Sequence, residues 1–159
     1  MNQKSLSRWL KVITVILGLM GIAFYAGVFP QLVNDLGNEF PEFKHLVLPS
    51  LIGIWVSGVP CYICLVLFWR ICTRIGQDRS FCPENAKALQ AIGLLAIFDS
   101  LLCLAVTVLL MLNNAINGGT FLISFTVMLV GAAVAVAAMA LSHLVMKAAL
   151  LKDENDLTI

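Results

Sequence analysis

Four long apolar segments, joined by short polar connections, make up most of this 159-residue chain. They lie at about residues 12–29, 46–69, 91–112 and 120–146, and each is close to the roughly 20 residues that a helix needs to cross a bilayer. Charged residues are 12% of the chain, against about 25% in soluble domains. We therefore predict an all-α integral membrane protein, an antiparallel bundle of four transmembrane helices that forms a single domain over residues 1–159.

The first segment also has the basic flank and apolar run of a signal peptide. Its apolar run continues as far as Phe29, however, which is longer than the hydrophobic region of a signal peptide. We expect it to be retained as a membrane span that ends before Pro30, because proline interrupts a helix.

The basic residues predict how the chain is oriented. Of the ten Lys and Arg residues, only Lys44 falls on the side of the first and third connections. The other nine are Lys4, Arg8, Lys11, Arg70, Arg74, Arg79, Lys87, Lys147 and Lys152. The positive-inside rule then places both termini, a hairpin at residues 70–90 and a tail at residues 147–159 in the cytoplasm.

Small residues recur in every segment at steps of three or four, so they fall on one face of each helix. In lipid, such stripes mark the faces where helices approach closely. The stripes are Gly18 and Gly21, then Ser50, Gly53, Ser57, Cys61 and Cys64, then Gly93, Ala96, Ser100, Cys103 and Thr107, and finally Gly131, Ala135, Ala138 and Ser142. Close packing of this kind leaves little volume for a wide solute pathway.

Asp99 lies near the middle of the third segment, where a charge costs at least about 2.5 to 3.5 kcal/mol. No Lys, Arg or His lies at that depth. We expect a neutral carboxyl that donates a hydrogen bond to the Val56 carbonyl, which Pro60 frees, or to Ser57 or Tyr25. Asp99 is then either a structural pin or a site for proton or cation coupling or for ligand sensing.

The cysteines and histidines suggest no reactive centre. Cys61 and Cys64 form a C-x-x-C motif, which resembles that of the quinone-linked disulfide-forming enzymes. They lie inside the second segment, however, and the outer connections contain no cysteine. Thiol exchange needs access and a partner disulfide, so a packing role is favoured. Cys72 and Cys82 are too few for a zinc site. We predict no metal, no cofactor and no enzyme activity.

The outer connection, residues 31–43, carries apolar side chains at helical spacing. They are Leu32, Val33, Leu36, Phe40 and Phe43. This pattern favours a short helix that rests on the bilayer, and an outer surface that senses a peptide or lipid is the alternative.

The hairpin and the tail carry opposite charges on the same side of the membrane. Our candidate partner-binding residues are Arg70, Arg74, Arg79, Phe81, Pro83, Glu84, Asn85, Glu154, Asp156, Leu157 and Ile159. The simplest interpretation is the positive-inside rule together with a solvated tail; the alternatives are contact with anionic lipid or a docking partner. The short apolar end with its free carboxylate suits strand addition or carboxylate capture.

Three stretches also resemble a known family: Phe68-Trp69-Arg70-Ile71, the run from Ser80 to Leu89, and the ending from Glu154 to Ile159. They are similar to a family of small four-span bacterial membrane proteins classed as a domain of unknown function. Such proteins are often encoded beside a Cro-like helix-turn-helix transcription regulator. The family hairpin usually has a serine helix cap where this chain has Cys82-Pro83.

The resemblance implies a membrane partner that holds or signals to the regulator through the hairpin and tail. We therefore predict a non-enzymatic regulatory or scaffolding membrane protein that contacts the bilayer and a cytoplasmic helix-turn-helix regulator, with no direct contact to nucleic acid. A second copy of the chain is a further candidate partner. The alternative is a small-ion or proton pathway, or a small-ligand sensor, centred on Asp99.

Overall fold

A computed structural model describes residues 3–116 and 118–156, with the side chains of Leu36, Glu39 and Asp156 left aside. Its elements are α1 (Gln3–Ala23), the π-helix η1 (Phe24–Val28), α2 (Phe29–Glu39), the 3-10 helix η2 (Pro41–Phe43), α3 (Lys44–Ile75), α4 (Pro83–Leu112) and α5 (Gly118–Asp156). The described residues form no strand. Four helices are long and apolar enough to cross a membrane, which confirms the predicted fold class.

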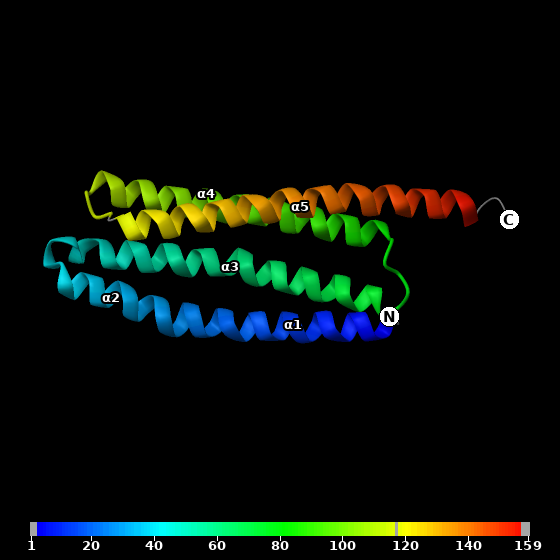
Figure 1. Ribbon diagram of the computed structural model, residues 1–159, viewed down its shortest axis with the longest axis horizontal. Coiled ribbons are helices and arrows are strands. Elements are labelled where there is room, and N and C mark those ends of the chain that lie inside the picture. The colour runs from blue at the N-terminus through cyan, green and yellow to red at the C-terminus, as the bar shows by residue number, and fades with distance from the viewer. Residues whose placement is uncertain (1–2, 117, 157–159) are drawn as a thin grey trace.

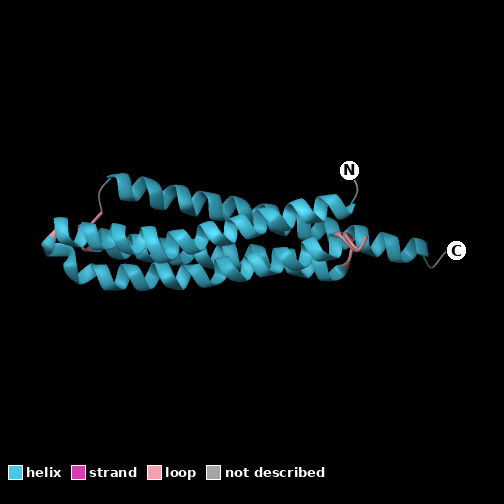
Figure 2. Ribbon diagram, turned by 90° about the horizontal axis from the view of Figure 1, so that it is seen from below, coloured by secondary structure: helices cyan, strands magenta, loops and turns pink. Residues whose placement is uncertain are grey.

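The long helices run antiparallel to one another (Figure 1). The start of α1, the turn between α3 and α4 and the end of α5 lie at the same end of the molecule, as Figures 1 and 2 both show. We call this the basic end, because nine of the ten Lys and Arg residues belong to its segments. The chain therefore has the up-and-down connectivity that the short connections predicted.

The helices pack in the order of the sequence. Among the described residues, Cα atoms come within 8 Å between α1 and α3, between α3 and α4, and between α4 and α5, but not between α1 and either α4 or α5. Near the basic end, a buried apolar cluster joins three of the helices through Ile71 of α3, Ile92 of α4 and Ala138 of α5. The central helices α3 and α4 thus hold the molecule together, and α1 and α5 flank them.

The interface between α4 and α5 is built from small residues, as their stripes predicted. A side chain on Gly93 would lie 2.9 Å from Met139 Cγ and 3.2 Å from the Ala135 carbonyl oxygen, and one on Gly131 would overlap Ser100. Such close approach replaces the hydrophobic effect, which does not drive helices together in lipid.

The interface between α1 and α3 combines small residues of α1 with an aromatic side chain of α3. The hydroxyl of Tyr62 donates to the Gly18 carbonyl at 2.8 Å, and a side chain on Gly21 would lie 2.8 Å from the same hydroxyl. Nearer the basic end, Ser7 is buried and donates to the Cys72 carbonyl at 2.5 Å. Glycine in α1 therefore makes room for a hydrogen bond between helices.

The first helix does not end at Pro30, so this predicted end of the first segment is wrong. The chain widens into η1, where the Phe29 N–H bonds to the Phe24 carbonyl, and it continues as α2. Pro30 has no N–H to offer, and the Tyr25 carbonyl instead accepts from Trp55 Nε1 at 3.3 Å. A π-turn and a side-chain donor from α3 thus allow the helix to continue past the proline.

A further expectation about the outer segment needs correction. The outer segment is not a separate helix on the bilayer: α2 continues from η1 and packs against the start of α3, where a side chain on Gly37 would overlap Val47. Residues 147–156 of the predicted tail continue α5 without interruption, whereas the short apolar end at residues 157–159 lies outside the described residues.

Candidate functional sites

A chain of polar side chains crosses the membrane-spanning part of the molecule. The Tyr25 hydroxyl in η1 lies 3.2 Å from Ser57 Oγ and donates to Cys61 Sγ at 3.8 Å. The Cys61 thiol in turn donates to Asp99 Oδ2 of α4 at 3.7 Å. Three elements that pack in series are therefore connected by one polar cluster, which we define as Tyr25, Ser57, Cys61 and Asp99.

Asp99 has one carboxyl oxygen without a partner. Oδ1 is buried and makes no hydrogen bond to any described residue. The sequence predicted that Asp99 would donate to the Val56 carbonyl, Ser57 or Tyr25, whereas its polar neighbour in the structure is Cys61. Tyr25 and Ser57 approach Asp99 only through Cys61. An unpaired polar atom away from water is costly, so Oδ1 is the feature of this cluster that most needs an explanation.

Sequence reasoning had assigned Cys61 to packing and missed its polar role. Cys61 lies one turn beyond Ser57 on the same face of the helix, a position that fits a packing role equally well. Cys64, the second cysteine of the motif, packs toward α4, with its Sγ 4.0 Å from the Ile92 carbonyl oxygen. Both thiols are free, and both lie against α4. The small-residue stripe predicted a close helix neighbour for this face.

The cysteines of the hairpin are buried apart from any cluster of metal-ligating groups. Cys72 is fully buried and Cys82 nearly so. Across the described part of the chain, no three His, Cys, Asp or Glu side chains gather closely enough to hold a metal ion.

The turn between α3 and α4 is organised around Asn85. Its side chain is 1% exposed, and its Nδ2 donates to the Arg79 carbonyl at 3.2 Å and the Ser80 carbonyl at 3.0 Å. Arg74 Nη1 donates to Asn85 Oδ1 at 3.3 Å. A buried amide that satisfies two turn carbonyls and receives a charged donor fixes the shape of the turn.

Helix α4 begins without the serine cap of the resembling family. Cys82 is extended and makes no side-chain capping bond, while Pro83 fills the first helical position, where a missing N–H is harmless. Glu84 lies in the first turn, where its negative charge interacts favourably with the helix dipole and stabilises the helix. The departure at Cys82-Pro83 therefore gives α4 a start that relies on proline and the helix dipole in place of a side-chain cap.

The hairpin residues that we predicted to bind a partner divide into two groups. Asn85 is buried and Arg74 partly buried, so these two support the turn and do not form its surface. Phe81 is 58% exposed, and the other members of the surface group are also exposed. They are Arg70, Arg79, Pro83 and Glu84. We call Arg79, Phe81, Pro83 and Glu84 the hairpin surface.

The end of α5 continues beside and then beyond this hairpin (Figure 1). Ala149 is 3% exposed, so the helix is still covered by other elements there, whereas Leu150 and Leu151 are 56% and 58% exposed. Glu154 is exposed on the last described turns. The Asp156 side chain and the predicted Leu157 and Ile159 lie outside what the structure describes.

The fold defines a class: this is a small all-helical membrane protein with four spans and without a separate soluble domain among the described residues. The chain belongs to the family described as "Protein of unknown function (DUF2975)", whose model matches residues 31–159. It is 26% identical to the uncharacterised membrane protein YoaS of Bacillus subtilis (strain 168) over 161 residues, which cover the whole of both chains. No solved structure matches it significantly.

Proposed function

We propose that this protein is a non-enzymatic membrane anchor that docks a cytoplasmic protein on the hairpin surface and the adjoining end of α5. The observation that carries the proposal is Phe81, a large aromatic side chain held 58% exposed on a turn that Asn85 makes rigid. Aromatic residues, including phenylalanine, and arginine are enriched in protein–protein interfaces. Arg79 lies two residues before Phe81.

The partner that we propose is a cytoplasmic helix-turn-helix transcription regulator, in keeping with the family resemblance. The basic end then faces the cytoplasm of a bacterial plasma membrane, as the distribution of Lys and Arg favours. Arg79 supplies a positive group and Glu154 a negative one on the same end of the molecule. Charge of both signs around an aromatic anchor gives a partner a defined orientation.

The test is site-specific photocrosslinking in native membranes. A crosslinking amino acid at Phe81 or Leu151 is expected to capture one regulator, whereas the same group at Asn114, in the turn at the other end of the molecule, is not. Substituting Arg79→Glu in the chain that carries the crosslinker at Leu151 is expected to reduce capture. Crosslinks from Phe81 to lipid alone would show that this aromatic is an interfacial anchor and would remove the docking proposal.

A second function rests on the polar cluster. We propose as the alternative that Asp99 is the centre of a small-ion or proton pathway, or of a sensor for a small ligand. The reason is that its buried Oδ1 is available to accept a hydrogen bond. Proton flux into proteoliposomes tests whether Asp99 belongs to a conducting pathway. The docking proposal predicts no flux with either the native chain or Asp99→Asn, whereas a proton pathway predicts flux that Asp99→Asn abolishes without a change in thermal stability.

A further inference from the structure

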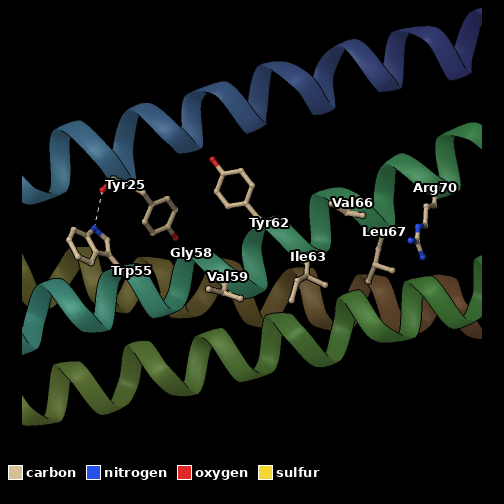
Figure 3. Close-up of a pocket in the computed structure, with 9 residues that line it drawn as sticks. All are labelled: Tyr25, Trp55, Gly58, Val59, Tyr62, Ile63, Val66, Leu67 and Arg70. Carbon is tan, nitrogen blue, oxygen red and sulfur yellow. Dashed lines mark hydrogen bonds between the residues drawn. The ribbon is translucent and has the colours of Figure 1, made fainter.

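An apolar groove of about 640 Å³ runs along α3 on the side of η1 (Figure 3). Tyr25 and Trp55 lie at one end of the groove and Arg70 lies at the other, with Tyr62 and Val66 between them. The side chains along its length are apolar or aromatic, and Arg70 is the one charged residue of the lining. The groove therefore changes from apolar to cationic along its own axis.

A second, basic pocket of about 360 Å³ lies between the beginning of α1 and the end of α3. Lys4, Arg8 and Lys11 line it from α1, and their spacing of four and three residues puts them on one helix face. Thr73 and Gln77 line it from α3. Together with Ser7 of α1, three cations and three uncharged polar side chains thus converge on a small volume at the basic end.

The groove and the basic pocket follow one another along the same face of α3. At 100° per residue, Trp55, Val66, Arg70, Thr73 and Gln77 lie within about 60° of one another on the helical wheel. Moreover, the Lys11 ammonium lies 5.2 Å from the centre of the Trp69 ring. This cation of the basic pocket therefore lies against the turn of α3 that also carries Arg70. The two hollows together have the polarity of an amphiphile, with an apolar body and a cationic head.

We propose that this face binds one anionic phospholipid, with an acyl chain in the groove and the phosphate held by Arg70 and the cations of the basic pocket. Charge selects the occupant, since four basic side chains and no acidic one line the two hollows. Basic pockets between helices near the membrane surface are suited to acidic headgroups.

The dimensions fit a lipid of the leaflet at the basic end. From Arg70 to Trp55 the helix rises 15 residues, or about 22 Å, and half of the hydrocarbon core is about 15 Å. An acyl chain whose headgroup is at Arg70 therefore runs along the groove over its whole depth in that leaflet. Trp69 and Arg70 then lie at the membrane interface, where tryptophan and arginine are both favoured.

The test is native mass spectrometry of the full chain in detergent with equal amounts of phosphatidylglycerol and phosphatidylcholine of identical chains. We expect the native protein to retain one phosphatidylglycerol in preference to phosphatidylcholine. Arg70→Gln is expected to lower that preference about fivefold, as for one basic residue near an anionic surface, and the triple change Lys4→Gln, Arg8→Gln and Lys11→Gln is expected to remove it.

Matched controls separate this site from general surface charge and general hydrophobicity. Lys87→Gln removes an exposed cation at the same end of the molecule but outside both hollows, and the preference is expected to persist. Val66→Trp fills the groove and is expected to reduce lipid retention, whereas Val136→Trp on the exposed surface of α5 is not. A melting temperature measured for each variant confirms that it is folded.

Three results would overturn the proposal. They are equal retention of the two lipids by the native chain, an equal loss of preference with Lys87→Gln, and retention that Val66→Trp leaves unchanged. A lipid-free dimer in which these hollows face a second copy would also overturn it, because the occupant would then be protein.

Discussion

Asn85 is the side chain whose removal should disturb the hairpin most. Replacing it with alanine leaves the Arg79 and Ser80 carbonyls without their donor and Arg74 without its acceptor. We expect Asn85→Ala to lower the free energy of unfolding by about 1 to 3 kcal/mol, the range for stranded buried polar groups. Reversible denaturant unfolding in detergent measures the change.

The control is Gln90→Ala, an exposed position on the same helix, which should change stability by less than about 0.5 kcal/mol. If the two variants were equally stable, Asn85 would not hold the turn. A loss of photocrosslinking from Phe81 in Asn85→Ala, with crosslinking retained in Gln90→Ala, would further link the rigidity of the turn to docking.

Single residues differ in how much the sequence reveals about them. Asp99 was identifiable because a carboxyl in the middle of an apolar span is costly wherever it points. Its contact with Cys61 was not, since a thiol has the size of the other small residues in its stripe and serves packing equally well. The burial of Asn85 was also hidden, because a polar residue within a charged turn normally belongs to the surface.

Among the elements, the α4–α5 interface depends on glycine. We expect Gly93→Val to destabilise the protein by about 1 to 3 kcal/mol, as overpacking does in a closely fitted interface, because the new Cβ meets Met139 at 2.9 Å and the Ala135 carbonyl at 3.2 Å. Thermal unfolding in detergent, followed by circular dichroism, is the measurement.

Gly27→Ala provides the matched comparison, because nothing lies within 4 Å of the position that its Cβ would take. This change should be neutral or slightly stabilising, since alanine favours a helix more than glycine does. If Gly93→Val were as well tolerated as Gly27→Ala, the small-residue packing of α4 on α5 would be refuted.

The hydrogen bond from Trp55 to the π-turn of the first helix should contribute to stability. Trp55→Phe removes the donor to the Tyr25 carbonyl and should cost about 0.6 kcal/mol, the average for a hydrogen bond between membrane helices. In a Pro30→Ala background, residue 30 regains an N–H that can satisfy a carbonyl of the preceding turn. The cost of Trp55→Phe should therefore be smaller there, and a double-mutant cycle of unfolding free energies measures the difference.

An additive cycle would mean that Trp55 and Pro30 are energetically independent. The π-turn itself also explains why one helix end was predicted wrongly. Proline normally ends or kinks a helix, and the sequence does not reveal that a tryptophan 25 residues later in the chain will supply the missing donor. The start of α4 was predictable, because Pro83 and Glu84 favour a first turn through local chemistry alone.

For the whole molecule, hydropathy was sufficient to predict four helices, but not the order in which they pack. A small-residue stripe shows that a helix has a close neighbour, but it does not identify which helix that neighbour is. The stripe of α3 illustrates the limit, since Ser57 approaches Tyr25 of η1, whereas Cys64 packs toward α4. Only the structure shows that α1 approaches α3 and that α5 approaches α4 among the described helices.

The orientation of the whole molecule in the membrane bears on both the docking and the lipid proposals, and one measurement tests it. Nine of ten basic residues belong to segments at one end, and an excess of Lys and Arg marks the cytoplasmic side. Alkaline phosphatase, which is active only outside the cytoplasm, should therefore be active when fused after Asn114 and inactive when fused after Lys152.

A fluorescent reporter that is active only in the cytoplasm should give the complementary pattern at the same two positions. This controls for fusion proteins that are not expressed. The opposite pattern would place the hairpin surface and the end of α5 outside the cell, out of reach of any cytoplasmic regulator. It would leave the apolar groove and its cations intact, but would assign them to a lipid of the outer leaflet. The two proposals therefore respond differently to one measurement, because docking depends on the compartment whereas lipid binding depends only on the shape and charge of the α1–α3 face.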